Sequence, residues 1–120
     1  MKISGKNKWL VIVNPNAGAG KCREDWPLIN NLLDQYNFDY EIVFTQKRYH
    51  AMIISRQKIK EGFHKIIVVG GDGSLNEVIN GMFAQRNFPT TAITIGMVPV
   101  GTGNDWARMF GISFKYDEAI

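Results

Sequence analysis

Short apolar runs alternate along this chain with longer segments in which apolar residues recur every three or four positions. The first pattern predicts strands and the second predicts helices. The predicted order is strand 8–14, helix 23–36, strand 39–45, helix 50–61, strand 65–70, helix 74–86, strand 93–99 and helix 104–111. Strict alternation with short connections implies right-handed crossovers, so we predict a three-layer α/β/α sandwich with a mainly parallel sheet.

Apolar residues at helical spacing are expected to face the core of this sandwich. They are Met52, Ile53, Ile54, Ile59, Val78, Ile79, Met82 and Phe83. Trp26 and Trp106 also lie on predicted helices, and we expect them to pack against the sheet rather than stack on a ligand.

A glycine-rich turn separates the third strand from the third helix. Gly70-Gly71-Asp72-Gly73-Ser74 follows the apolar residues 66–69 directly. Because glycine tolerates φ > 0, we expect a turn whose backbone N–H groups are exposed and can hold phosphate. A lone carboxylate would repel phosphate, so Asp72 is expected to act through Mg²⁺ or to accept a proton during phosphoryl transfer. The alternative is an Asp-Gly turn that only joins strand to helix.

Two further glycine-containing loops have the same setting. Residues 14–21 follow the first predicted strand, and residues 99–105 follow the fourth. Parallel strands bring such loops to one edge of the sheet, where ligands bind, so we expect the three loops to form one site. Lys21 and Arg23, at the start of the first helix, are either anion partners or solvated charges.

Familiar nucleotide-binding signatures are absent from these loops. A Walker A loop ending at Gly20-Lys21 would need glycine at Pro15 and Ser or Thr at Cys22. No glycine pair extends to G-x-G-x-x-G, which argues against an ordinary Rossmann dehydrogenase. Residues 74–77 fit a capping box, so Glu77 serves either its own helix or a ligand.

Composition narrows the class further. The 120 residues, 45% of them hydrophobic, suit one domain with a modest core. The net charge is +3 and the basic residues are scattered, which argues against nucleic acid as a partner. The run Lys47-Arg48, with Lys58 and Lys60, is expected to be a solvated face. The single cysteine, Cys22, excludes an internal disulfide and is interpreted as a bystander. No signal peptide or membrane span is visible, so we expect a cytoplasmic location.

Four spaced motifs resemble the N-terminal catalytic domain of the diacylglycerol kinase family, which includes soluble bacterial lipid kinases. The motifs are Asn14-Pro15-x-x-Gly18-x-Gly20, Thr45 followed by His50-Ala51, Gly70-Gly71-Asp72-Gly73-Ser74-x-Asn76-Glu77, and Pro99-x-Gly101-Thr102-Gly103-Asn104-Asp105-x-Ala107-Arg108. The resemblance runs from about Leu10 to the end of the chain. Ser74 is a departure, because the family usually has Thr there, although the hydroxyl is kept.

The resemblance implies ATP and Mg²⁺ as cofactors and the fold that the family's N-terminal domain shares with NAD kinase. Asp72 resembles the essential acid near the γ-phosphate, and Asp105 resembles part of an acidic network that handles Mg²⁺ through water. His50 has no role that the sequence fixes; it could cap a helix or line the cleft. The nucleotide-binding positions implied are Asn14, Thr45, Gly70, Gly71, Asp72, Gly73, Ser74, Leu75, Asn76, Glu77, Gly101, Thr102, Gly103 and Asn104.

The expected activity is transfer of the γ-phosphoryl group of ATP to the hydroxyl of a diacylglycerol-like or sphingoid lipid, presented at the inner face of a membrane. NAD kinase, which shares the Gly-Gly-Asp-Gly motif, and a nucleotide-binding module without activity are the alternatives. The family also has a C-terminal β-rich domain that binds the lipid and supplies the catalytic base. We therefore expect residues 1–120 to be a truncated catalytic domain, inactive alone, with exposed apolar surface that favours self-association.

Overall fold

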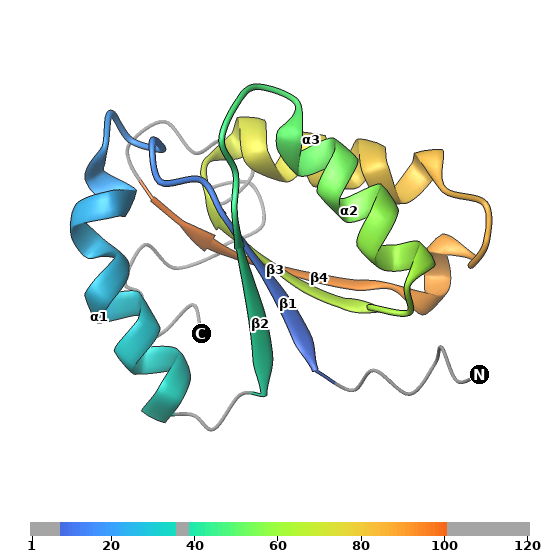
Figure 1. Cartoon of the computed structure of the whole chain (residues 1–120), viewed down its shortest axis with the longest axis horizontal. Coiled ribbons are helices and arrows are strands. Elements are labelled where there is room, and N and C mark those ends of the chain that lie inside the picture. The colour runs from blue at the N-terminus through green and yellow to red at the C-terminus, as the bar shows by residue number, and fades with distance from the viewer. Residues whose placement is uncertain (1–7, 36–38, 101–120) are drawn as a thin grey trace.

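Four parallel strands and three helices form the part of the chain that this computed structural model describes, residues 8–35 and 39–100. The strands are β1 (Trp9–Val13), β2 (Tyr40–Phe44), β3 (Lys65–Gly70) and β4 (Thr94–Pro99) (Figure 1). The helices are α1 (Lys21–Gln35), α2 (His50–Lys60) and α3 (Asp72–Ala84), and a 3₁₀ turn, η2 (Thr90–Ala92), precedes β4. The predicted elements within these residues are confirmed to within two residues at each end; the helix predicted at 104–111 lies outside them.

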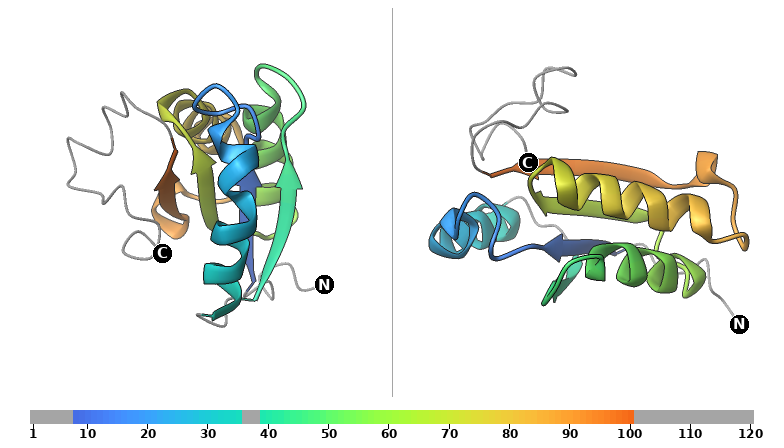
Figure 2. Two further views of the ribbon diagram at one scale, coloured as in Figure 1. Left: turned by 90° about the vertical axis from the view of Figure 1, so that its left-hand side faces the viewer. Right: turned by 90° about the horizontal axis from the view of Figure 1, so that it is seen from above.

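The strand order is β2-β1-β3-β4, and every pairing is parallel. The chain therefore moves from β1 to β2 in one direction, and then crosses back to β3 on the other side of β1. Right-handed crossovers in opposite directions place their helices on opposite faces of the sheet. In agreement, α1 covers one face, while α2 and α3 cover the other (Figure 2). The three-layer α/β/α sandwich predicted from the sequence is confirmed.

Alternate residues of the central strands fill two separate cores. Leu10, Ile12, Ile66 and Val68 pack under α2 and α3, whereas Val11, Val13, Ile67 and Val69 pack under α1. Because both faces are covered, these strands read as continuous apolar runs. Trp26 packs against the second core and meets the Phe44 ring edge-on with centroids 5.6 Å apart, which confirms its structural interpretation.

Cys22 lies fully buried in the core beneath α1, as expected for a bystander. Burial, with a smaller contribution from the charge of Asp25, raises the pKa of its thiol to about 11. The thiol is therefore neutral near pH 7 and poorly nucleophilic.

Two residues predicted to face the core point to solvent instead. Ile53 is 54% exposed and Phe83 is 62% exposed. Helical spacing identified the correct helices, but α2 and α3 each bury one stripe against the sheet and one against each other. Ile54, Ile59 and Val78 fill those stripes, and this leaves Ile53 and Phe83 outside them.

Helices α2 and α3 run side by side and approach closely at Gly81. A Cβ atom at this position would overlap Ser55 Oγ and would lie 2.5 Å from the Met52 carbonyl oxygen and 3.1 Å from the Arg56 nitrogen. The buried Ser55 hydroxyl donates to the Met52 carbonyl oxygen at 3.0 Å, so its hydrogen-bond donor is satisfied within the contact. The backbone of α3 is helical at Gly81, so any residue could adopt its conformation. Glycine is required here because the two helices lie too close together for a side chain.

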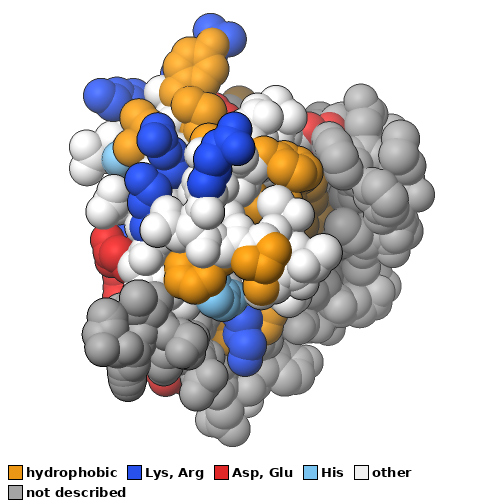
Figure 3. All heavy atoms as spheres, turned by 90° about the vertical axis from the view of Figure 1, so that its right-hand side faces the viewer, with side chains coloured by type: hydrophobic (Ala, Val, Ile, Leu, Met, Phe, Trp, Pro, Cys, Tyr) orange, Lys and Arg blue, Asp and Glu red, His pale blue; other side chains and the backbone are white. Residues whose placement is uncertain are grey.

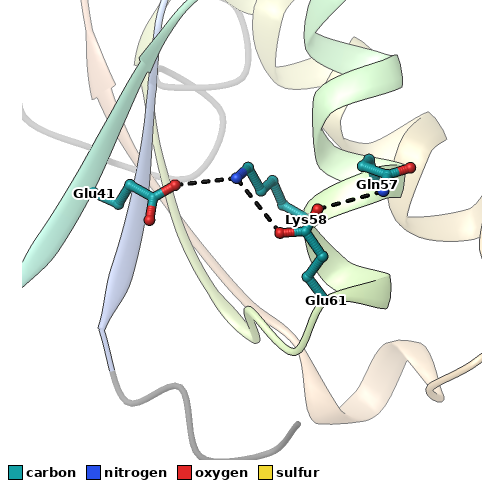
Figure 4. A network of polar contacts seen from close by, with 4 residues as sticks. All are labelled: Glu41, Gln57, Lys58 and Glu61. Atoms are coloured by element: carbon teal, nitrogen blue, oxygen red, sulfur yellow. Dashed lines mark hydrogen bonds and ion pairs between the residues drawn. The ribbon is translucent and has the colours of Figure 1, made fainter.

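An ionic network ties the other end of α2 to the sheet. Lys58 Nζ lies 3.1 Å from Glu41 Oε2 on β2 and 3.5 Å from Glu61 Oε1, and Gln57 donates to Glu61 Oε2 (Figure 4). The hydrogen bond to Glu41 raises the pKa of Lys58 above its ordinary value. Lys58 thus has a structural role rather than forming a freely solvated face.

Candidate functional site: a pocket at the carboxyl edge of the sheet

The strand order creates a switch point between β1 and β3, where connections leave toward opposite faces. In open parallel sheets, ligands bind in the crevice outside the carboxyl ends of strands at such a point. Asn14 directly follows β1, and Gly71 directly follows β3, so both lie at this crevice.

A pocket of about 290 Å³ opens at this edge. Three chain segments line it, namely the residues that follow β1, the connection from β2 into α2, and the first part of α3. The lining residues are Asn14, Asn16, Thr45, Lys47, Arg48, Ala51, Gly73, Ser74 and Glu77. The structure thus brings together Asn14, Thr45, Gly73, Ser74 and Glu77 from the set of residues that the sequence singled out.

Asn14 links the first segment to the third. Its side-chain amide donates to Ser74 Oγ at 3.3 Å, its Oδ1 accepts the Asn16 N–H at 3.0 Å, and its own backbone N–H donates to the Val69 carbonyl. These bonds fix Asn14 across the switch point. A ligand in the pocket would therefore meet a polar surface that is already ordered.

The glycines of the β3–α3 turn do not have the positive φ that the sequence led us to expect. None of Gly70, Gly71 and Gly73 has a positive φ, and Gly71 is extended, with φ −111°. A Cβ at Gly70 would lie 2.9 Å from Ser74 Oγ, so close approach excludes a side chain there. A Cβ at Gly73 would meet nothing within 4 Å and would project into open space at the pocket. The missing side chain at Gly73 leaves room for a ligand.

The amino end of α3 presents backbone donors to this pocket. Leu75 N–H donates to the Gly71 carbonyl at 3.1 Å, so the amides of Gly73 and Ser74 precede the first bond of the helix. Such amides, together with the positive end of the helix dipole, favour an anion.

Asp72 is the first residue of α3 and is half-buried, but it does not line the pocket. Leu75 is buried in the core, and Asn76 is exposed on α3 outside the lining. Across residues 8–35 and 39–100, no group of three or more His, Cys, Asp or Glu could hold a metal ion.

The connection from β2 to α2 adds positive charge that sequence reasoning missed. Lys47 and Arg48 line the pocket, and the Arg48 guanidinium lies over the Tyr49 ring, 4.9 Å from its centroid. Thr45, only 8% exposed, anchors the start of this connection through its N–H bond to the Val13 carbonyl at 2.8 Å. The sequence signal that could have identified these two residues is their place after the second predicted strand, because a connection that follows a parallel strand starts at the same sheet edge as the glycine loops.

His50 lies at the start of α2 and accepts the Gln46 N–H on Nδ1 at 2.9 Å. It does not line the pocket. Its contact shapes the loop that carries Lys47 and Arg48.

The capping-box prediction for α3 is wrong. The cap residue of α3 is Gly71, three residues before the expected cap Ser74, and no side chain caps the helix. Glu77 instead reaches the neighbouring helix, where Oε2 accepts the Tyr49 N–H and Oε1 accepts the Ala51 N–H, each at 3.2 Å. A contact between residues this far apart in sequence leaves no local pattern from which it could be predicted.

The loop after β1 satisfies its own backbone. Gly18, Ala19 and Gly20 all have left-handed φ, and the Gly20 N–H donates to the Asn16 carbonyl. At the start of α1, Lys21 is mostly exposed and its Nζ lies 3.1 Å from Asp25 Oδ2. This surface ion pair favours the interpretation of Lys21 as a solvated charge over that of an anion partner.

Arg23 donates to Asn16 Oδ1 at 2.8 Å and so supports a residue of the pocket wall without lining the pocket itself. The remaining predicted site residues, Gly101, Thr102, Gly103, Asn104 and Asp105, lie outside the described residues, as does Trp106. The last described residue, Val100, donates its N–H to the Gly70 carbonyl at 2.9 Å, beside the β3–α3 turn.

Fold and site together define a parallel α/β domain with a polar pocket at its switch point. The sequence profile of the diacylglycerol kinase catalytic domain matches residues 8–120, and the chain belongs to this family. The resemblance drawn from the four motifs is thereby confirmed.

Known relatives agree with this assignment. A diacylglycerol kinase of Staphylococcus carnosus (strain TM300) is 35% identical over 98 residues, covering 82% of this chain and 31% of that protein. Sphingosine kinase 1 of Caenorhabditis elegans is 37% identical over 101 residues, covering 79% of this chain and 21% of that protein. A crystal structure of a diacylglycerol kinase from Bacillus anthracis str. Sterne matches with a TM-score of 0.76 and 32% identity, over 93% of this chain and 37% of that one. The chain thus spans well under half the length of these relatives.

Proposed function

We propose that this chain is the nucleotide-binding part of an ATP-dependent lipid kinase. The observation that carries the proposal is the pocket in which the amino end of α3 faces Lys47 and Arg48. Backbone donors and two cations around an open space suit a chain of phosphates. Membership of the diacylglycerol kinase family supports a lipid hydroxyl as the acceptor.

In the proposed reaction, the lipid hydroxyl oxygen attacks the γ-phosphorus of ATP. The new P–O bond forms as the bond to the β-phosphate oxygen breaks, and ADP leaves. The amides of Gly73 and Ser74 would orient the phosphates, while Lys47 and Arg48 would offset their negative charge. The hydroxyl proton would go to a base that the resemblance places in the family's second domain.

Mg²⁺ fits this site in part. Magnesium is usually held by one or two carboxylates together with substrate phosphates, and it neutralises charge on the phosphates. Asp72, at the first position of α3, and Asp105, acting through water, are the carboxylates we propose for it. Glu77 is a poor candidate, because both of its oxygens already accept backbone N–H groups.

The surface of α2 supports presentation of the lipid at a membrane. Tyr49, Ile53, Arg56 and Lys60 recur at helical spacing and are all exposed. On the side of the molecule to which α2 and α3 extend, Lys and Arg side chains stand beside exposed hydrophobic ones (Figure 3). No helix among the described residues is long and apolar enough to cross a membrane. We propose peripheral contact with an anionic lipid surface, as on the inner face of a bacterial membrane.

Two measurements test the proposal. Calorimetric titration of the chain with Mg·ADP should detect weak binding, and Asp72→Ala should change its metal dependence more than the fold. A protein that contains this domain together with the family's second domain should phosphorylate a lipid hydroxyl in mixed micelles and leave NAD untouched. Formation of NADP without labelled lipid would establish the NAD kinase alternative. Absence of binding at millimolar nucleotide would remove the claim of a usable site in this domain.

A further inference from the structure

Helix α2 begins without a cap from its own sequence. Its cap residue, Tyr49, has a left-handed backbone with φ 66° and makes no capping bond with its side chain. The first turn also contains no acidic residue. A helix start of this kind leaves backbone donors to be satisfied from elsewhere, and a bulky residue at positive φ persists only where its surroundings hold it.

Glu77 supplies the missing cap from α3. Its two carboxylate oxygens accept the N–H groups of Tyr49 and Ala51, which lie on either side of the helix start. A carboxylate at this end also complements the helix dipole. Helices α2 and α3 are also in close contact one turn further along, at Gly81.

The cap also fixes the loop that carries the pocket's cations. Lys47 and Arg48 are exposed, and they stand between Thr45, which is bonded to β1, and Tyr49, which is bonded to Glu77. The Gln46 N–H bond to His50 closes the loop between these anchors. Release of the Tyr49 anchor would free one end of this short segment, including Tyr49 itself, whose ring the Arg48 guanidinium covers.

We infer that Glu77 is a positioning residue: by capping α2 it holds Lys47 and Arg48 against the pocket, where they meet the phosphates of a nucleotide. This inference rests on the proposed function and deepens it. Direct contact between the Glu77 carboxylate and a phosphate would be repulsive. The two amide N–H groups that Glu77 accepts offset part of its negative charge, and these bonds hold the start of α2 in place.

The test compares Glu77→Ala and Glu77→Gln with the parent chain, using ADP and adenosine as probes. Glu77→Ala should weaken ADP binding about tenfold, as for loss of a well-placed charged contact, and leave adenosine binding within about twofold. Glu77→Gln keeps a side-chain oxygen acceptor and should restore most of the ADP affinity. Glu24→Ala, which removes an exposed carboxylate from α1, is the matched control and should change neither affinity.

A second readout needs no ligand. Amide hydrogen exchange at Tyr49 and Ala51 should accelerate in Glu77→Ala and remain near the parent value in Glu24→Ala. Unchanged exchange at both amides, or equal losses for ADP and adenosine, would overturn the inference. A parent chain that binds no ADP would instead overturn the proposed function, while the exchange data would still decide whether Glu77 caps α2.

Discussion

Gly81→Ala tests the packing of α2 against α3, on which the shape of the pocket depends. In an open helix this change would stabilise the chain by about 0.5–1 kcal/mol, because alanine is the better helix former. Here the added methyl overlaps the Ser55 hydroxyl and lies 2.5 Å from the Met52 carbonyl oxygen. The Ser55 side chain can rotate, but the Met52 carbonyl is part of the α2 backbone and cannot, so the helices must move apart.

Overpacking of this kind costs about 1–3 kcal/mol, and loss of the Ser55 hydrogen bond adds about 1 kcal/mol. Set against the gain in helix propensity, the net destabilisation should be about 1–3 kcal/mol. For a domain of this size the melting temperature should fall by roughly 5–20 °C. Urea unfolding followed by circular dichroism gives the free energy directly.

The control for this prediction is Gly96→Ala in β4, where a Cβ would meet nothing within 4 Å. Its unfolding free energy should stay within about 0.5 kcal/mol of the parent value. Ser55→Ala combined with Gly81→Ala should recover part of the loss, because the hydroxyl is gone while the Met52 carbonyl remains. If Gly81→Ala proves as stable as the parent, the close helix approach described here is incorrect.

Three further predictions concern the pocket, the buried thiol and the ionic network. Gly73→Ala should leave the melting temperature nearly unchanged and weaken Mg·ADP binding in calorimetry, because its methyl enters open space at the pocket; unchanged affinity would place the ligand elsewhere. Cys22, with its pKa raised to about 11, stabilises the fold fully below pH 9, and this contribution of up to about 2–3 kcal/mol should be lost as the pH rises through 11. Cys22→Ala should therefore show a flatter stability profile between pH 9 and 11, and parallel profiles would contradict this. Glu41→Gln should lower the unfolding free energy by less than about 1 kcal/mol, and the loss should shrink in high salt, because its partner Lys58 is only partly buried; a larger, salt-independent loss would show a buried pair.

Local sequence patterns predicted most of the fold. Apolar runs located β1 and β3 because strands buried on both faces contain few polar residues, and glycine and polar residues marked their ends. The order β2-β1-β3-β4 was beyond the same patterns, since buried strands carry no local signal of which neighbour they pair with. Pattern also failed at Ile53 and Phe83, whose exposure depends on where α2 and α3 touch.

The site was predictable where it depends on strand ends and less so where it depends on contacts across the fold. Asn14, Thr45 and Ser74 follow strands and met at the pocket as the topology required. Glu77 was misread because a capping box is a local pattern, whereas its actual partners lie on another helix. Lys47 and Arg48 are exposed, as expected for a solvated face, but the path of the β2–α2 connection also places them on the pocket, which no local pattern indicates.

The central pairing of β1 with β3 has a consequence for how the chain acquires its site. Leu10 pairs with Ile66, so the strands that flank the pocket meet only after a long loop containing α1, β2 and α2 has closed. Closing such a loop costs entropy before any contact repays it, which slows the step. Asn14 and Ser74 cannot bond until then, and a partly folded chain holding only β1, α1 and β2 lacks the side of the pocket that α3 supplies. A nucleotide in the pocket would therefore bind and stabilise only the state in which β1 and β3 are paired. We expect such a ligand to slow unfolding of the central strands and to leave the rate of the earlier collapse unchanged.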